Sequence, residues 1–100
     1  SNEMLERGEV DTCLLVGSEG VLHMSPRAVS RLRKIPTIAL EYPTAEPALQ
    51  PTVRFTTGVY GIHFAGTAYR MDEVPIPLRP ILSTHYPSDA DVLEAICRRL

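Results

Sequence analysis

The sequence predicts an α/β fold, a three-layer α/β/α Rossmann-like sandwich with a mostly parallel sheet and a C-terminal edge hairpin. Two apolar runs, 12–17 and 37–40, have the character of buried strands. The segment between them contains Ser25-Pro26, a capping residue before a proline that suits the first position of a helix. A strand, a helix and a strand with short connections form a βαβ unit, so these two strands are expected to be parallel.

The connecting helix is amphipathic. Ala28, Val29 and Leu32 recur on one face, and the basic residues of the segment point away from it: Arg27, Arg31, Arg33 and Lys34. The pattern predicts a helix of about ten residues that Pro36 ends. Residues 42–51 contain three prolines and are predicted to form a structured loop.

The ends of the chain are predicted to be helical. Asn2 can cap a short helical turn that stops at Gly8, because glycine suits the left-handed position after a helix. A third strand begins near Val53 and Phe55. Ser88 caps a final helix, and its predicted buried stripe consists of Val92, Leu93, Ile96 and Leu100.

A hairpin is predicted between the third strand and the last helix. Residues 67–71 and 74–78 alternate in polarity, and Asp72-Glu73 supplies a polar turn between them. Pro75 and Pro77 lie two positions apart, so both missing N–H groups are on one side of the returning strand. That side cannot be paired, which predicts an edge strand.

Composition sets the class of protein. One hundred residues with 44% apolar and 22% charged content suit one domain, expected over residues 3–100, with Ser1-Asn2 interpreted as a tag remnant.

A net charge of −2 provides no basic field, so neither nucleic acid nor a membrane is expected as a partner. The apolar runs are too short for a membrane span or a signal peptide, and a cytoplasmic location is expected.

Cysteines and histidines give no sign of a catalytic or metal site. Cys13 and Cys97 lie far apart, without metal-ligand spacing, and are predicted to be reduced, buried thiols. His23, His63 and His85 are not paired with a nucleophile at a suggestive spacing. No catalytic or metal-binding residue is therefore predicted in this chain.

Residues 66–80, GTAYRMDEVPIPLRP, carry a family resemblance. They resemble a C-terminal segment of the B subunit of the tungsten or molybdenum formylmethanofuran dehydrogenases, in the molybdopterin guanine dinucleotide oxidoreductase superfamily. The resemblance extends across nearly all of the rest of the chain, from residues 4–11 through 13–18 to 89–93. Because that polypeptide is several times longer, the resemblance implies an excised domain. Its partners would be the rest of its own subunit and the other dehydrogenase subunits, and the isolated fragment is expected to self-associate.

The resemblance also points to a binding edge. The loop Gly17-Ser18-Glu19-Gly20 follows the first strand, where α/β sheets bind nucleotides, but it lacks the G-x-G-x-x-G fingerprint and by itself is more typical of a plain turn. Larger members of the superfamily have Gly-x-Asn-Pro there, an acidic residue after the next strand and a threonine four positions later. Gly17, Ser18 and Glu41 match this pattern. Glu19-Gly20 replaces Asn-Pro, and the threonine is Thr44, one position early.

The function that the resemblance implies is that of the intact B subunit. It reduces carbon dioxide reversibly to formate, which another subunit condenses with methanofuran in methanogenesis-type one-carbon metabolism. A tungsten or molybdenum ion is held there by two pyranopterin guanine dinucleotides. The metal ligand and the iron–sulfur cysteines lie upstream of the matched segment, so the fragment would bind part of a dinucleotide and lack activity.

Two alternatives stay open at this point. One is a relative of the same B subunit in a formyltransferase/hydrolase complex that has no redox metal. The other is a stand-alone nucleotide-binding or interaction domain.

Overall fold

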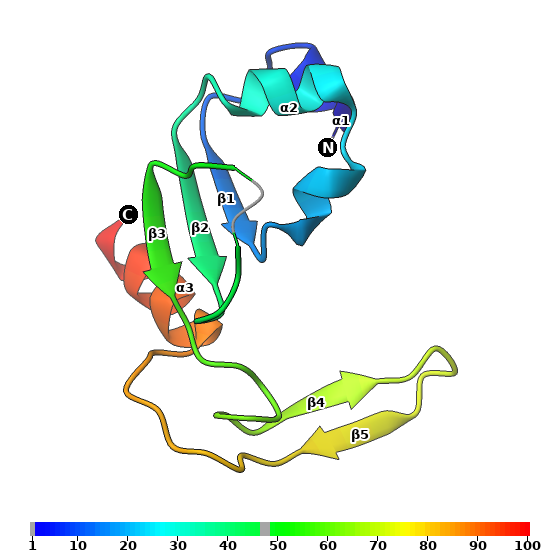
Figure 1. The fold of residues 1–100 in the computed structure, drawn as a ribbon, viewed down its shortest axis with the longest axis vertical. Coiled ribbons are helices and arrows are strands. Elements are labelled where there is room, and N and C mark those ends of the chain that lie inside the picture. The colour runs from blue at the N-terminus through cyan, green and yellow to red at the C-terminus, as the bar shows by residue number, and fades with distance from the viewer. Residues whose placement is uncertain (1, 47–48) are drawn as a thin grey trace. The chain divides into compact units, whose positions relative to one another are not determined.

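The computed structural model describes residues 2–46 and 49–100, which form two compact units that divide between Phe55 and Thr56 (Figure 1). Pro47, part of the predicted loop, lies outside the described residues. The elements are α1 (Asn2–Glu6), β1 (Cys13–Val16), the 3-10 helix η1 (Glu19–His23), α2 (Pro26–Leu32), β2 (Thr37–Glu41), β3 (Val53–Thr56), β4 (Gly66–Tyr69), β5 (Pro75–Leu78) and α3 (Asp89–Arg99).

The first unit contains a three-stranded sheet in the order β1-β2-β3, with all three strands running the same way (Figure 1). β1 and β2 pair in parallel, with Cys13 opposite Thr37 and Val16 opposite Leu40. The predicted βαβ unit and the mostly parallel sheet are therefore confirmed. η1 was not predicted from the sequence.

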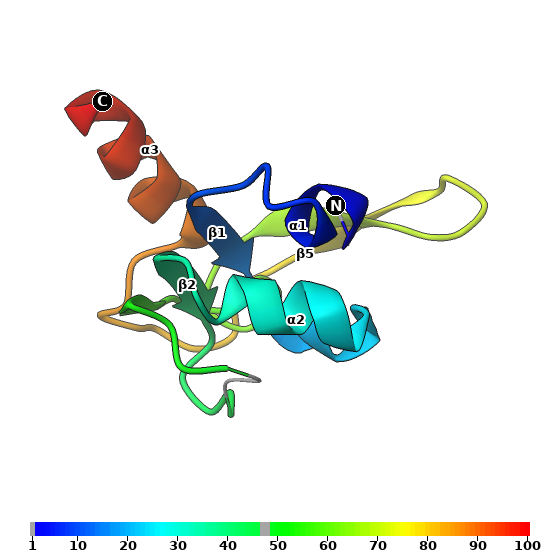
Figure 2. The same cartoon turned by 90° about the horizontal axis from the view of Figure 1, so that it is seen from above.

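Helices cover one face of this sheet. α1 and α2 pack side by side (Figure 2), and Cys13 and Leu15 of β1 pack against the buried core of Leu5, Val21, Ala28, Leu32 and Leu49. α2 begins as predicted, because the Ser25 hydroxyl accepts a hydrogen bond from the Ala28 N–H at 3.2 Å. It has seven residues, fewer than predicted, because the chain turns at Arg33 to reach β2.

The opposite face of the sheet carries exposed apolar side chains. Leu14 and Val16 alternate with Cys13 and Leu15, so they point to the other side of the sheet. They are 45% and 54% exposed. Within the first unit the helices thus form one layer, and the third layer of the predicted sandwich is not confirmed.

The second unit contains the predicted hairpin. β4 and β5 are antiparallel, and they form a separate two-stranded sheet instead of an edge of the parallel sheet. The Arg70 N–H donates to the Val74 carbonyl at 3.0 Å. In an antiparallel ladder every second pair is hydrogen-bonded, so Pro75 and Pro77 fall in the non-bonded pairs and their nitrogens face outward, as predicted.

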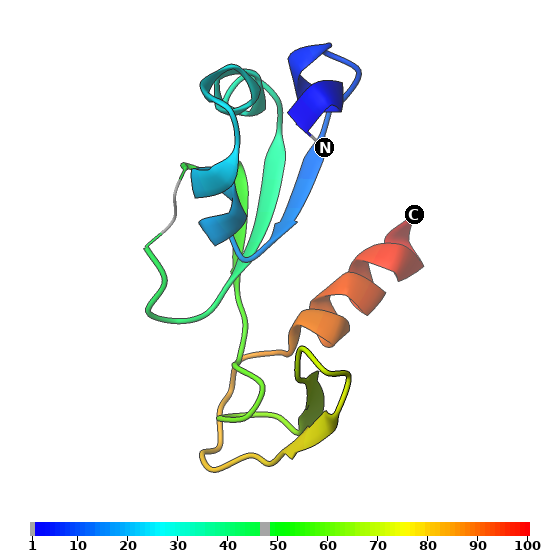
Figure 3. The ribbon, with the colours of Figure 1, turned by 90° about the vertical axis from the view of Figure 1, so that its right-hand side faces the viewer.

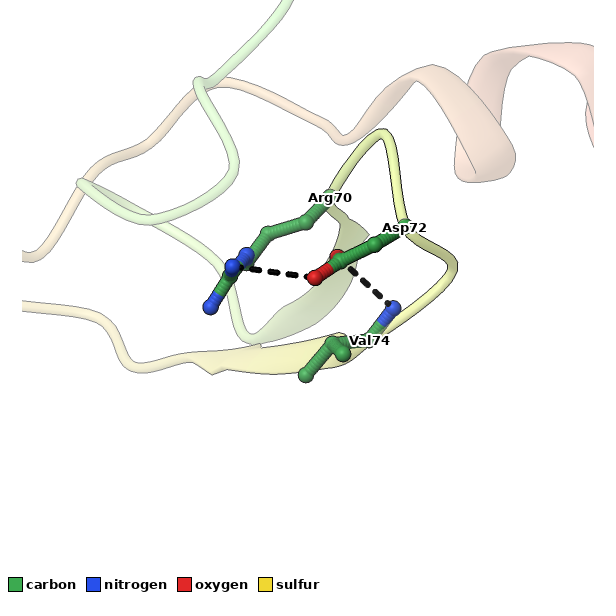
Figure 4. A network of polar contacts seen from close by, with 3 residues as sticks. All are labelled: Arg70, Asp72 and Val74. Atoms are coloured by element: carbon green, nitrogen blue, oxygen red, sulfur yellow. Dashed lines mark hydrogen bonds and ion pairs between the residues drawn. The ribbon is translucent and has the colours of Figure 1, made fainter.

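The hairpin turn is held by a small polar network (Figure 4). The Arg70 guanidinium and the Asp72 carboxylate form an ion pair at 3.0 Å, and the Val74 N–H donates to the same carboxylate at 3.4 Å. Glu73 adopts a positive φ of 65°. The polar turn is therefore confirmed.

Helix α3 begins with a capping box. The Ser88 hydroxyl accepts from the Asp91 N–H, and the Asp91 carboxylate accepts from the Ser88 N–H, both at 3.1 Å. Val92 is buried and Leu93 and Ile96 are half-buried. Leu100 is 98% exposed, so its predicted place in the buried stripe is wrong, because it lies past the end of the helix.

Leu32 has no exposed surface and sits at the centre of the helix-side core. We expect Leu32→Ala to lower the free energy of unfolding by about 2–5 kcal/mol, since the substitution leaves a cavity. Leu22→Ala is the matched control, because Leu22 is 73% exposed and its loss should change the free energy of unfolding by less than about 0.5 kcal/mol. Urea unfolding measures both, and equal losses would contradict the assigned core.

Candidate functional site

The carboxyl ends of β1 and β2 bring two of the predicted site residues together. The pairing of Val16 with Leu40, continued by one position, places Gly17 beside Glu41. The Gly17 N–H donates to the Leu40 carbonyl at 2.9 Å and holds the two strand ends in this register. In open α/β sheets this is the edge at which ligands bind.

Glu41 is the unusual residue of this edge. It lies two positions after Ala39, which pairs with Leu15 of the core-facing row, so its side chain points toward the helix-covered face. Glu41 is 1% exposed, and neither carboxylate oxygen has a hydrogen-bond partner among the described residues. Burial of an unpaired carboxylate costs several kcal/mol, so this side chain is not there for stability.

Gly17 has a clear conformational role. Its φ is +73°, a region that favours glycine, and a Cβ at this position would approach the Glu19 Oε2 atom to 2.8 Å. Its N–H is already bonded to Leu40. This N–H group is therefore not available to a ligand. Because glycine has no side chain, a ligand could still approach the Gly17 backbone closely.

Ser18 and Thr44 differ in their surroundings. Ser18 is 3% exposed and precedes η1, with its carbonyl accepting from the Val21 N–H at 3.0 Å. Thr44 is exposed and lies in the turn that the Ala45 N–H to Tyr42 carbonyl bond closes at 3.1 Å. Gly17, Ser18 and Glu41 thus cluster at the strand ends, and Thr44 lies on the turn that follows β2.

Two histidines make contacts with neighbouring residues of the second unit. The His63 Nδ1 atom accepts from the Val59 N–H at 2.9 Å, and the His85 ring lies 4.3 Å from that of Tyr86.

The two cysteines differ in their exposure. Burial raises the pKa of the Cys13 thiol, which keeps it protonated. Cys97 is exposed, so the prediction that it is buried is wrong: it lies on the solvent side of α3. Across residues 2–46 and 49–100, no three His, Cys, Asp or Glu side chains are arranged to hold a metal ion.

Asp89 is a second carboxylate that sequence reasoning did not single out for burial. Its Oδ1 atom is buried and has no hydrogen-bond partner in the part of the chain that the structure describes. It is the first residue of α3, where the positive end of the helix dipole stabilises a carboxylate. That position explains its presence without a ligand.

Comparison with known proteins supports one relationship. The chain is 29% identical over its whole length to the B subunit of the tungsten-containing formylmethanofuran dehydrogenase 2 of Methanococcus maripaludis. It is 36% identical over 82% of its length to the protein of the same name from Methanocaldococcus jannaschii. The aligned regions span 24% and 19% of those relatives, so the chain corresponds to a quarter or less of their length. No model of a protein family matches it.

The conformation of Gly17 gives a testable prediction. Gly17→Ala should lower the free energy of unfolding by about 1–2 kcal/mol, because an L-residue is strained at this positive φ. Gly20→Ala is the control, since no atom lies within 4 Å of its Cβ position and its φ is not positive. Thermal unfolding followed by circular dichroism compares the two variants, and a Gly17→Ala protein as stable as Gly20→Ala would argue against the turn described.

The burial of Glu41 gives a second prediction. Glu41→Met should raise the free energy of unfolding by about 1–3 kcal/mol, because it removes an unpaired buried carboxylate and keeps an unbranched side chain of similar size. Glu9→Met, at an exposed glutamate, should change stability by less than about 0.5 kcal/mol. If Glu41→Met unfolds at lower urea than the unsubstituted chain, the carboxylate has a stabilising partner and the interpretation fails.

Proposed function

We propose that this chain is the C-terminal, dinucleotide-binding part of the B subunit of a formylmethanofuran dehydrogenase. Two named relatives support this choice of parent protein, since the similarity to them extends along the whole chain in one case and over 82% of it in the other. Both relatives are named as tungsten-containing, which favours the redox enzyme over a metal-free relative. The intact protein would take part in the reversible reduction of carbon dioxide to formate and formylmethanofuran.

The single observation that carries the binding role is the unpaired carboxylate of Glu41. An ionised carboxylate has two acceptor oxygens, and guanine presents the N1–H and the exocyclic amine side by side as a matching pair of donors. Adenine has no such pair of adjacent donors. A buried acceptor pair at the carboxyl edge of a parallel sheet therefore fits the guanine end of molybdopterin guanine dinucleotide.

Glu41 is buried, so a guanine base reaches it only after the residues around it open locally. Pairing both oxygens with ligand donors removes the cost of an unpaired buried charge, and this gain favours the opened, bound state. In the bound enzyme the dinucleotide would supply the tungsten or molybdenum redox centre. The residues of this chain would hold its nucleotide end through Glu41, with Gly17 and Ser18 beside the base and Thr44 on the neighbouring turn.

The Glu19 carboxylate makes the site less suited to the phosphates of a dinucleotide than to its guanine base. It lies over Gly17, within 2.8 Å of the position that a Cβ would occupy, where it would repel the phosphates of a dinucleotide. Glu19 is exposed and its side chain is free to turn away. The guanine end of the site is therefore better defined in this chain than the phosphate end.

Across residues 2–46 and 49–100, no helix is both long and apolar enough to cross a bilayer. The other dehydrogenase subunits and the rest of the parent polypeptide are the proposed partners. A three-layer sandwich would be completed when another helical layer covers the open sheet face around Leu14 and Val16.

Titration of the chain with GDP and with ADP tests the proposal. GDP should shift the NMR signals of Gly17, Ser18 and Glu41 selectively, with a Kd on the order of millimolar because the chain supplies only part of the site. Glu41→Gln should erase the preference for GDP, since an amide cannot accept two hydrogen bonds in the same way. Glu19→Gln is the matched control, and it should bind GDP at least as well as the unsubstituted chain. Equal shifts with ADP would refute the assignment of Glu41.

A further inference from the structure

The two oxygens of the Glu41 carboxylate define what a ligand of this site must offer. Both are buried, and neither has a hydrogen-bond partner among residues 2–46 and 49–100. An ionised carboxylate accepts hydrogen bonds and donates none. A planar ligand satisfies both oxygens at once when it presents two adjacent N–H donors along one edge. The carboxylate therefore selects an edge of the ligand, whichever ring system lies behind that edge.

Guanine is not the only heterocycle with this edge. Its pyrimidine ring carries the N1–H beside the 2-amino group. Pterins contain the same 2-amino-4-oxopyrimidine ring, in which the N3–H lies beside the 2-amino group. In both ring systems the larger substituent is attached to the second ring, away from these donors. A carboxylate that pairs with guanine can therefore pair with a pterin through the same two hydrogen bonds.

The turn after β1 favours a ligand without phosphates. Gly17 follows β1, and the chain then leads into η1 (Figure 3). A Cβ at Gly17 would lie 2.8 Å from the Glu19 Oε2 atom, so this carboxylate stands over the glycine that lies beside Glu41. A phosphate brought to this position meets a like charge, and a neutral pterin brings no such charge.

We propose that a free pterin without phosphate groups is a second ligand of the Glu41 site, bound through the same carboxylate oxygens as guanine. The proposal rests on the proposed guanine-binding role of Glu41. Free pterin and guanine nucleotide exclude one another, because both need the same two acceptors. The pterin binds more tightly than GDP, because only GDP brings phosphates toward Glu19.

Neopterin and lumazine, two phosphate-free pteridines, test the recognised edge with the full chain. Neopterin has the N3–H and the 2-amino group side by side, and lumazine has a carbonyl in place of the amine. Neopterin should shift the NMR signals of Gly17, Ser18 and Glu41. Lumazine should bind at least about tenfold more weakly, because its carbonyl would face a carboxylate oxygen.

A variant of Glu41 separates recognition from a structural role. Glu41→Gln should reverse the preference, since the amide offers one acceptor and one donor, which match the N3–H and the carbonyl of lumazine. Glu9→Gln, at an exposed glutamate, is the matched control and should keep the preference for neopterin. Equal binding of neopterin and lumazine to the unsubstituted chain, or a preference for neopterin that survives Glu41→Gln, would overturn the proposal.

Guanosine and GDP distinguish the pterin role from the guanine role. Guanosine should bind like neopterin, and GDP should bind about two- to fivefold more weakly than either. Glu19→Gln should remove that difference and leave neopterin binding unchanged. GDP should displace neopterin, and simultaneous binding of the two would contradict a shared site. If guanosine binds through Glu41 and neopterin does not, the pterin role is wrong and the guanine role stands. If neither binds, both roles are wrong.

Discussion

The parallel pairing of β1 with β2 is the constraint on which the rest of the first unit depends. Its register decides which side chains face the helices, and a shift by one residue would turn Leu15 outward and Leu14 inward. The same register aligns the two strand ends, so that Gly17 lies beside Glu41. The register of this one parallel pairing therefore determines both the core and the candidate site, and a change of register would alter both.

Local signals in the sequence were sufficient for most of the elements. Ser25-Pro26 and Ser88 marked the helix starts, and the spacing of Pro75 and Pro77 gave the outward side of β5. These signals act within a few residues, which is why they can be interpreted without the fold. Leu100 was misplaced because a helical pattern does not show where the last turn ends. Coverage of the second sheet face depends on contacts between distant segments, and local patterns do not contain them.

The candidate site was only partly predictable for the same reason. Family resemblance pointed to Gly17, Ser18, Glu41 and Thr44, but it could not show that the Gly17 N–H is bonded to Leu40 or that Glu19 lies over Gly17. Nor could it show that both oxygens of Glu41 are buried without a partner among the described residues. That arrangement is unfavourable for folding, and natural proteins often keep such local costs at functional sites. The proposed link between Glu41 and a nucleotide rests on this unpaired carboxylate.

A crystal structure of the chain grown with GDP tests this link most directly. The account predicts that the Glu41 carboxylate lies within hydrogen-bonding distance of both the N1 and the exocyclic amine of guanine, with the base beside Gly17. Guanine bound elsewhere, or a Glu41 carboxylate that is already paired with a protein donor or an ordered water in the absence of nucleotide, would contradict it.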